Sequence, residues 1–181
     1  MKHKIKISIS IIICLLPMIA GAVFYNQLPD QMPIHFGIND VPDNYAPKAF
    51  ALFGIPLILA IVQSLAMIIT YRSANKKNIR LPIIFYLLEW LIPVLTVLCY
   101  GLMLSFALGY LISIGKIICL VLGAMFVIIG NYTPKMSYEA GKLLFHPNPA
   151  TEEDFRKMSR LTGYGLIGCG LILILLGIFV V

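Results

Sequence analysis

Long apolar runs alternate with short polar segments along this chain of 181 residues. A helix that crosses the hydrocarbon core of a membrane needs about 20 mostly apolar residues. Three runs are close to that length, at residues 7–24, 50–71 and 162–181. A further run, at residues 81–129, is far too long for one crossing and must fold back on itself. The pattern therefore predicts an all-α, polytopic transmembrane helical bundle.

The long run contains a group of residues that interrupt helices and divide it in two. They are Gly109, Tyr110, Ser113 and Gly115. Glycine and small polar residues are common where a helix ends and the chain turns. We therefore expect a third span near residues 81–106 and a fourth near residues 114–129, which makes about five spans.

Composition agrees with a membrane protein. The chain is 60% hydrophobic and 12% charged, with a mean hydropathy of +0.92, whereas soluble domains carry roughly 25% charged residues. One soluble core could not bury so many apolar side chains, so the lipid bilayer is the first expected partner.

The net charge of +6 is distributed beside the apolar spans and does not form a patch with interleaved aromatic residues. Such a patch is typical of nucleic-acid binding, so we expect no direct contact with nucleic acid. All four cysteines fall within apolar runs and lack the spacing of metal or redox motifs. We therefore expect no disulfide, no metal ion and no cofactor.

Basic residues predict the orientation, because loops rich in Lys and Arg stay in the cytoplasm. Lysines precede the first span, and residues 72–80 form a short basic connection after the second. The amino terminus and the later segment 130–161 are then cytoplasmic, and the loop at residues 25–49 faces outward. A cleaved export signal ending near Ala20–Ala22 is the alternative for the first span; the apolar run continues past it, which favours an uncleaved helix.

This organisation suggests two modules along the sequence. Residues 1–80 form a two-span module with the outward loop at 25–49, and residues 81–181 form a three-span module with the cytoplasmic segment at 130–161.

The outward loop is rich in proline and cannot be one continuous helix. We expect short extended pieces and turns. His35, with Asp30, Asp40 and Asp43, offers the polar chemistry of this loop. One histidine among scattered aspartates lacks the spacing of metal ligands, so a hydrogen bond within the loop is the favoured role of His35, and a metal or peptide site is the alternative.

Two polar residues lie deep within predicted spans. Glu89 is in the third span, and Gln63 of the second span lies at a similar depth, so the two can hydrogen-bond. Pro93 removes the backbone donor that would reach the Glu89 carbonyl, which predicts a kink there. We favour a neutral or paired glutamate that fastens two helices, with a proton relay or ligand contact as the alternative.

Two local patterns predict helix packing. Gly115, Cys119 and Gly123 form a stripe of small residues that suits close packing in the bundle, or alternatively a homodimer face. Thr151 is suited to cap a helix in which Phe155 and the apolar residues at 158 and 161 share one face, resting on the membrane interface or the bundle.

The loop sequence Leu28-Pro29-Asp30-Gln31-Met32-Pro33-Ile34-His35-Phe36, followed by Asp43-Asn44-Tyr45 and Lys48, resembles the amino-terminal module of SdpI-like membrane proteins. Gly130-Asn131-Tyr132-Thr133-Pro134-Lys135, with Phe155 and Arg160, resembles the carboxyl-terminal module of that family. The chain departs from the family in two respects. It reads Gly141-Lys-Leu-Leu-Phe-His-Pro147 where an Arg-Thr-Pro-Trp turn is usual, and it offers five spans in place of six.

The resemblance implies a non-enzymatic immunity or sensor protein of the bacterial plasma membrane. Such a protein gives resistance to a secreted peptide toxin and is in some cases coupled to transcriptional signalling. Two sets of contact residues follow from it. A peptide toxin would meet the outward set: Asp30, His35, Asp40, Asp43, Asn44, Tyr45 and Lys48. A cytoplasmic repressor would meet the inner set: Asn131, Tyr132, Pro134, Lys135, Phe155 and Arg160.

Two other functions are weighed against this one. A small transporter or channel component would use Glu89 and Gln63 along a pathway. An intramembrane enzyme is disfavoured, because no facing acid and base or set of metal ligands can be named.

Overall fold

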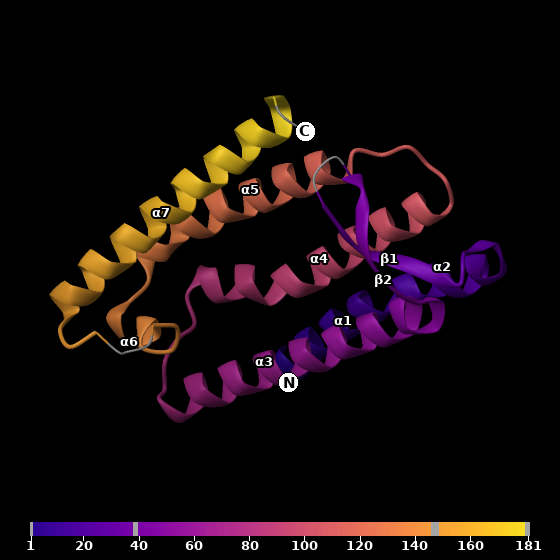
Figure 1. Ribbon diagram of the computed structural model, residues 1–181. Helices are drawn as coiled ribbons and strands as arrows, with labels where there is room; N and C mark the ends of the chain where they lie inside the picture. Colours follow the sequence, from indigo (N-terminus) through magenta and orange to yellow (C-terminus); the bar gives the residue numbers. More distant parts are fainter. Residues whose placement is uncertain (1, 38–39, 146–148, 180–181) are drawn as a thin grey trace. The chain divides into compact units, whose positions relative to one another are not determined.

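The computed structural model describes residues 2–37, 40–145 and 149–179 (Figure 1). The long helices are α1 (Lys2–Leu15), α2 (Pro17–Phe24), α3 (Ile55–Lys76), α4 (Ile83–Ala107), α5 (Ile114–Tyr132) and α7 (Glu152–Phe179). Short elements complete the described chain: η1 (Tyr25–Gln27), β1 (Gln31–Phe36), β2 (Pro42–Pro47), the π-helical η3 (Phe50–Gly54), η4 (Thr133–Lys135) and α6 (Tyr138–Gly141).

Five helical segments of the described chain are long and apolar enough to cross a membrane. They cover His3–Gln27, Phe50–Lys76, Ile83–Ala107, Ile114–Lys135 and Glu152–Phe179. These segments confirm the all-α fold of about five spans, and the protein is a multi-pass membrane protein. Residues 180 and 181 of the predicted fifth span lie outside the described residues. The side of the membrane on which the amino terminus lies stays a prediction.

The described chain divides into two compact units. Unit 1 comprises Met1–Ile68 and Glu89–Gly115, and unit 2 comprises Ile69–Leu88 and Lys116–Val181. Each unit combines segments from both sides of residue 80, whereas the predicted modules 1–80 and 81–181 are continuous stretches of sequence. That sequence division stays a prediction.

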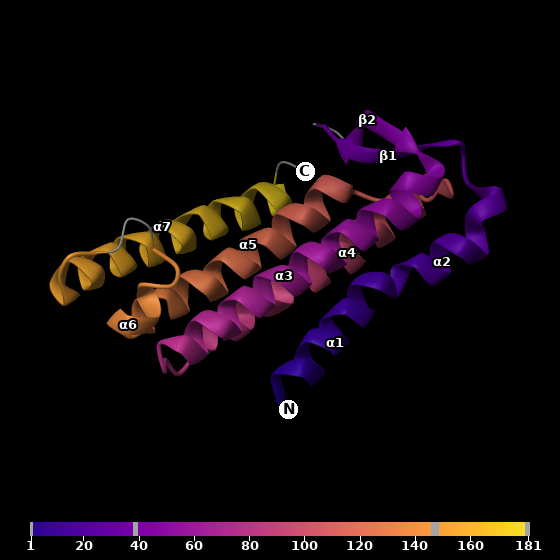
Figure 2. The same ribbon diagram turned by 90° about the horizontal axis from the view of Figure 1, so that it is seen from below.

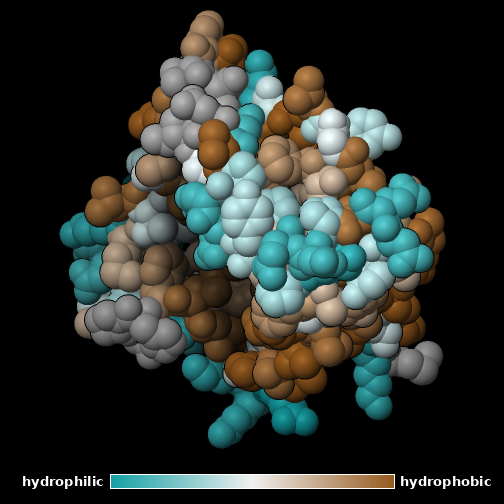
Figure 3. All heavy atoms as spheres, turned by 45° about the vertical axis from the view of Figure 1, so that its right-hand side comes forward, coloured by the Kyte–Doolittle hydropathy of each residue, from teal (hydrophilic) through white to brown (hydrophobic). Residues whose placement is uncertain are grey.

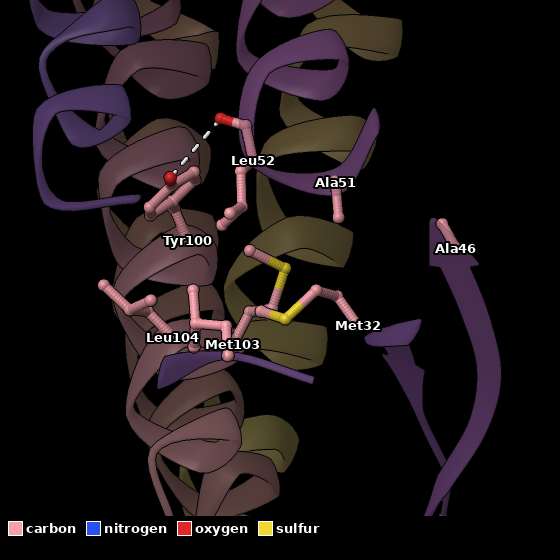
Figure 4. Close-up of a cluster of buried hydrophobic side chains, with 8 residues drawn as sticks. Met32, Ala46, Ala51, Leu52, Tyr100, Met103 and Leu104 are labelled. Atoms are coloured by element: carbon pink, nitrogen blue, oxygen red, sulfur yellow. Dashed lines mark hydrogen bonds between the residues drawn. The ribbon is translucent and has the colours of Figure 1, made fainter. Parts of the chain in front are cut away.

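In unit 1 the proline-rich loop folds into an antiparallel hairpin of β1 and β2. The predicted short extended pieces are thus confirmed, and they pair with each other. Met32 lies opposite Ala46, and both are buried. They join a core with Leu52 and with Tyr100 and Met103 of α4. Figure 4 shows the Met32 side chain pointing from the hairpin toward Met103, and the Tyr100 hydroxyl donating to the Leu52 carbonyl at 3.3 Å.

In unit 2, α5 and α7 lie side by side, as Figures 1 and 2 both show. Glycines allow this approach. A Cβ atom on Gly123 would lie 2.7 Å from the Gly170 carbonyl oxygen, and one on Gly130 would lie 2.6 Å from that of Gly163. A Cβ on Gly177 would meet Cys119 at 3.1 Å. Only glycine permits this backbone contact.

The predicted small-residue stripe is therefore confirmed as bundle packing for Cys119 and Gly123, and stays a prediction for Gly115. Gly115 belongs to unit 1, where its backbone N–H donates to Asp40. A homodimer face stays a prediction.

Of the predicted apolar face of the last helix, Phe155 packs inside the bundle, and contact of the other two residues with the membrane interface stays a prediction. Phe155 is buried, but Leu161 is 76% exposed and Met158 is only partly buried. The buried face continues instead through Ser159 and Gly163. Because lipid is as apolar as leucine, large side chains gain nothing by turning inward, and small residues take the helix contact.

Candidate functional site

The hairpin is fixed at its base by Lys48. Its ammonium donates to the Leu28 carbonyl at 3.0 Å, lies 3.2 Å from the Asp30 carboxylate and sits 4.7 Å from the centre of the Tyr25 ring. The Lys48 backbone N–H also donates to the Asp30 carbonyl at 2.8 Å. Lys48 and Asp30, both predicted to bind a ligand, thus close the hairpin onto the chain that enters it.

The other end of the hairpin is fixed by Asp40. Its carboxylate accepts a hydrogen bond of 2.6 Å from the Gly115 N–H, in the first turn of α5. The first N–H groups of a helix have no partner within it, and the helix dipole favours an anion there. Phe36 packs edge-on against Phe106 of α4 at 5.0 Å between ring centres. Asp40 is therefore engaged as a helix cap.

His35 hydrogen-bonds within the loop, as predicted. Its Nδ1 lies 2.5 Å from Asp43 Oδ1, and the two side chains are 68% and 53% exposed. The register of the hairpin is irregular on both sides of His35, which brings His35 near Asp43 across the two strands. The four polar residues of the loop are thus engaged in three separate places. Within the described ranges, no three His, Cys, Asp or Glu residues lie close enough to hold a metal ion.

The exposed side of the hairpin carries a mixed set of groups that we call the hairpin surface. It consists of Ile34, His35, Val41, Asp43, Asn44 and Tyr45, all exposed. Val41 is 60% and Tyr45 is 52% exposed, so apolar groups lie beside a histidine and a carboxylate. Figure 3 looks toward the side where the hairpin lies, and hydrophilic residues gather there among hydrophobic ones. Asn44 and Tyr45, predicted to bind a ligand, are both exposed.

A second polar feature is buried in unit 1. The Gln63 side-chain amide donates to Ser10 Oγ at 2.9 Å and to the backbone carbonyl of Glu89 at 2.6 Å. That carbonyl has no helical donor because residue 93 is proline. The predicted link between Gln63 and Glu89 therefore exists, but it reaches the main chain of Glu89.

The Glu89 side chain is only 8% exposed, and no described residue hydrogen-bonds its Oε1 atom. Helix α4 runs through Pro93 as one continuous helix. The Gln63 amide takes the place of the missing backbone donor, which keeps the helix intact at the proline.

A third feature is a groove of about 310 Å³ in unit 2, between the end of α5 and the start of α7. Four residues of the predicted inner set line it: Pro134, Lys135, Phe155 and Arg160. Asn131 and Tyr132, the other two residues of that set, contact Lys135. The Lys135 ammonium lies 3.3 Å from Asn131 Oδ1 and 4.7 Å from the centre of the Tyr132 ring.

Helix caps shape this groove. Thr151 Oγ1 accepts from the Asp154 N–H at 3.1 Å, so α7 begins at Glu152 as the sequence predicted. Ser137 Oγ accepts from the Ala140 N–H at 3.4 Å and starts α6. Phe155 fills the space behind, with ring centres 5.9 Å from both Tyr138 and Phe145.

Beside the groove, Lys142 Nζ lies 2.9 Å from Glu139 and 4.1 Å from the centre of the Tyr138 ring. The Glu139 carboxylate raises the pKa of this lysine above its ordinary value. The ion pair lies at the surface, where its effect on stability is small. Residues 146–148, at the end of the segment that replaces the Arg-Thr-Pro-Trp turn, lie outside the described residues.

Sequence reasoning missed several residues that the structure brings to these features. Ser10 partners Gln63, and Tyr100 joins the core beneath the hairpin. Neither has a sequence signal that names its partner. By contrast, Gly163, Gly170 and Gly177 recur every seventh residue, a spacing that is visible in the sequence and predicts a helix-packing face.

Comparison with known proteins connects these features to a family. A family model described as a domain of unknown function, DUF1648, matches residues 12–60, which comprise most of the first span, the hairpin and the start of α3. The chain is also similar to the immunity protein SdpI of Bacillus subtilis (strain 168). The two are 28% identical over 174 residues, which is 94% of this chain and 81% of that protein.

These two matches support an SdpI-like family for the chain. The likeness runs through both the hairpin and the groove, because it extends over nearly the whole chain. This SdpI-like protein is a multi-pass protein of the cell membrane. No solved structure matches it.

Proposed function

We propose that this SdpI-like protein is a membrane immunity protein that gives resistance to a secreted antimicrobial peptide. The similarity to an immunity protein over 94% of the chain carries this proposal. In the proposed mechanism the hairpin surface faces outward and binds the peptide directly, without any enzymatic step.

The geometry of the hairpin supports this role. Lys48 and Asp40 fix its two ends, so the exposed groups are held in one arrangement before a ligand arrives. A pre-ordered surface loses less conformational entropy on binding. Val41 and Tyr45 offer apolar contacts to a membrane-active peptide, and the His35–Asp43 pair offers polar contacts beside them.

Expression in a sensitive strain tests the proposal. Cells that make the wild-type protein should survive a secreted membrane-active peptide encoded beside its gene. The double variant Val41→Ser/Tyr45→Ser should lose at least about tenfold in protection, because two exposed apolar contacts are removed from the binding surface. Leu144→Ser provides a matched control, since Leu144 is an exposed apolar residue far along the chain from the hairpin.

Membrane insertion of each variant is measured on the same cells. Unchanged killing of the wild-type cells by every co-encoded peptide would overturn the immunity proposal. Equal protection by the double variant and the Leu144→Ser control would show that the hairpin surface does not bind the peptide.

A transporter or channel component is the second candidate, and one observation favours it. The buried Glu89 Oε1 has no hydrogen-bond partner among the described residues. Proton flux into proteoliposomes that is abolished by Glu89→Ala would support this function. If Glu89→Gln keeps protection and only lowers the melting temperature, Glu89 has a structural role and the transport function is rejected.

Coupling to a cytoplasmic repressor through the inner set also stays a proposal. It predicts that a candidate repressor is crosslinked at the groove in cells and is released by substitution of Lys135.

A further inference from the structure

We propose that the groove between the end of α5 and the start of α7 binds the phosphate headgroup of an anionic phospholipid. This inference is independent of the proposed immunity function. It assigns a ligand to the groove from its charge, its size and its position along the spanning helices.

The charge of the groove favours an anion. Three cations line it, Lys135, Arg156 and Arg160, against one carboxylate, Glu152. Glu152 is already paired with Arg156 at 2.7 Å. Within the described part of the chain, no carboxylate lies within ion-pair distance of Arg160. Lysine and arginine therefore present positive charge to this space that the protein itself does not neutralise, and guanidinium groups suit phosphate oxygens well.

The neutral lining of the groove also fits a headgroup. Ser137 and Tyr138 line the groove with the cations. The Tyr138 hydroxyl donates to the Pro149 carbonyl at 3.0 Å, which fixes this side of the groove. Pro134, Met136 and Phe155 form its apolar part, and the last two are buried. The volume of about 310 Å³ is at the small end of ligand pockets and suits one headgroup better than a folded protein segment.

The position of the groove distinguishes a lipid from a free phosphate. Helix α7 has 28 residues, whereas the hydrocarbon core needs about 20. Arg160 is the last charged residue of α7, and an uncharged run of the helix follows it, which places the edge of the hydrocarbon near Arg160. The next large side chains, Leu161 and Tyr164, are 76% and 67% exposed, as expected for residues that face acyl chains and the membrane interface. The groove thus lies at the headgroup level, with apolar helix surface directly below it.

Lipid binding to the purified full-length protein tests this inference. Native mass spectrometry measures the retention of phosphatidylglycerol and of phosphatidylcholine from mixed nanodiscs. Wild type should retain phosphatidylglycerol preferentially. Arg160→Gln and Lys135→Gln should each lower that retention about tenfold, because each removes a charge-assisted contact to the phosphate.

Lys157→Gln is the matched control. Lys157 is on the same helix, loses the same charge on substitution and pairs with Glu153 at 2.9 Å, but does not line the groove. It should retain phosphatidylglycerol like wild type. The preference of wild type for phosphatidylglycerol over phosphatidylcholine is measured without any variant, so a folding defect in Arg160→Gln does not leave the inference untested.

Three results would overturn the inference. Equal retention of the two lipids by wild type would show that the groove does not select an anionic headgroup. If glycerol 3-phosphate displaces phosphatidylglycerol completely, the groove binds a soluble phosphate and not a lipid. If Arg160→Gln and Lys135→Gln retain phosphatidylglycerol like wild type but lose a crosslinked repressor, the groove binds a protein partner.

Discussion

At the scale of single residues, the buried amide of Gln63 has the clearest role. It connects α1 and α4 by donating to Ser10 and to the Glu89 carbonyl. An unsatisfied buried carbonyl is expensive, and within a membrane no water replaces the lost donor. Gln63 therefore supplies the donor that Pro93, one turn after Glu89 in α4, cannot provide.

Gln63→Leu should lower the free energy of unfolding by about 1–2 kcal/mol, because the Glu89 carbonyl loses its donor. Thermal unfolding in detergent measures the change. Ser64→Ala is the control, since the Ser64 hydroxyl donates to the Ala60 carbonyl within its own helix, and it should have a smaller effect. Equal melting temperatures for Gln63→Leu and wild type would contradict this role.

At the scale of elements, the contact of α5 with α7 depends on glycine. The backbones approach so closely that a single methyl group at Gly170 would lie 2.6 Å from the Gly123 carbonyl oxygen. By contrast, a Cβ atom on Gly168, two residues earlier, has no neighbour within 4 Å. The two positions differ in packing but share the same helix.

Gly170→Ala should therefore destabilise unit 2 by about 1–3 kcal/mol, the usual effect of an overpacked contact. Gly168→Ala should be neutral or slightly stabilising, because alanine favours the helix by up to about 1 kcal/mol. Thermal melts of the two variants, measured side by side in the same detergent, check this difference. If both variants melt alike, the glycine contact does not hold these helices together.

At the scale of the whole molecule, the immunity proposal needs the hairpin to lie outside the cell. The basic residues on either side of the first two spans predict that arrangement. The five candidate spans fit it equally well in either direction.

Labelling of intact cells with a membrane-impermeant maleimide determines the orientation. Cysteine introduced at His35 should react, and cysteine introduced at Lys76 should react only after the cells are opened. The parent chain is the control, because its four cysteines lie within apolar runs. Reaction at position 76 and not at position 35 in intact cells would invert the topology and exclude an extracellular peptide partner.

The sequence alone determined the features that depend on local chemistry. Apolar runs fixed the five spans, prolines fixed the extended loop, and Thr151 fixed the start of α7. These follow from the length of a span, the φ angle of proline and the unpaired N–H groups of a helix end. The pairing of His35 was also predictable, because a polar partner lay within the same short loop.

Only the tertiary structure decided the contacts between segments far apart in sequence. Asp40 caps a helix 75 residues away, Gln63 reaches a backbone carbonyl and not a carboxylate, and the buried face of α7 continues from Phe155 through small residues. In a membrane, hydrophobicity places a helix in the bilayer but does not choose its neighbours. Close packing and the satisfaction of a few buried polar atoms make that choice, and both depend on the fold as a whole.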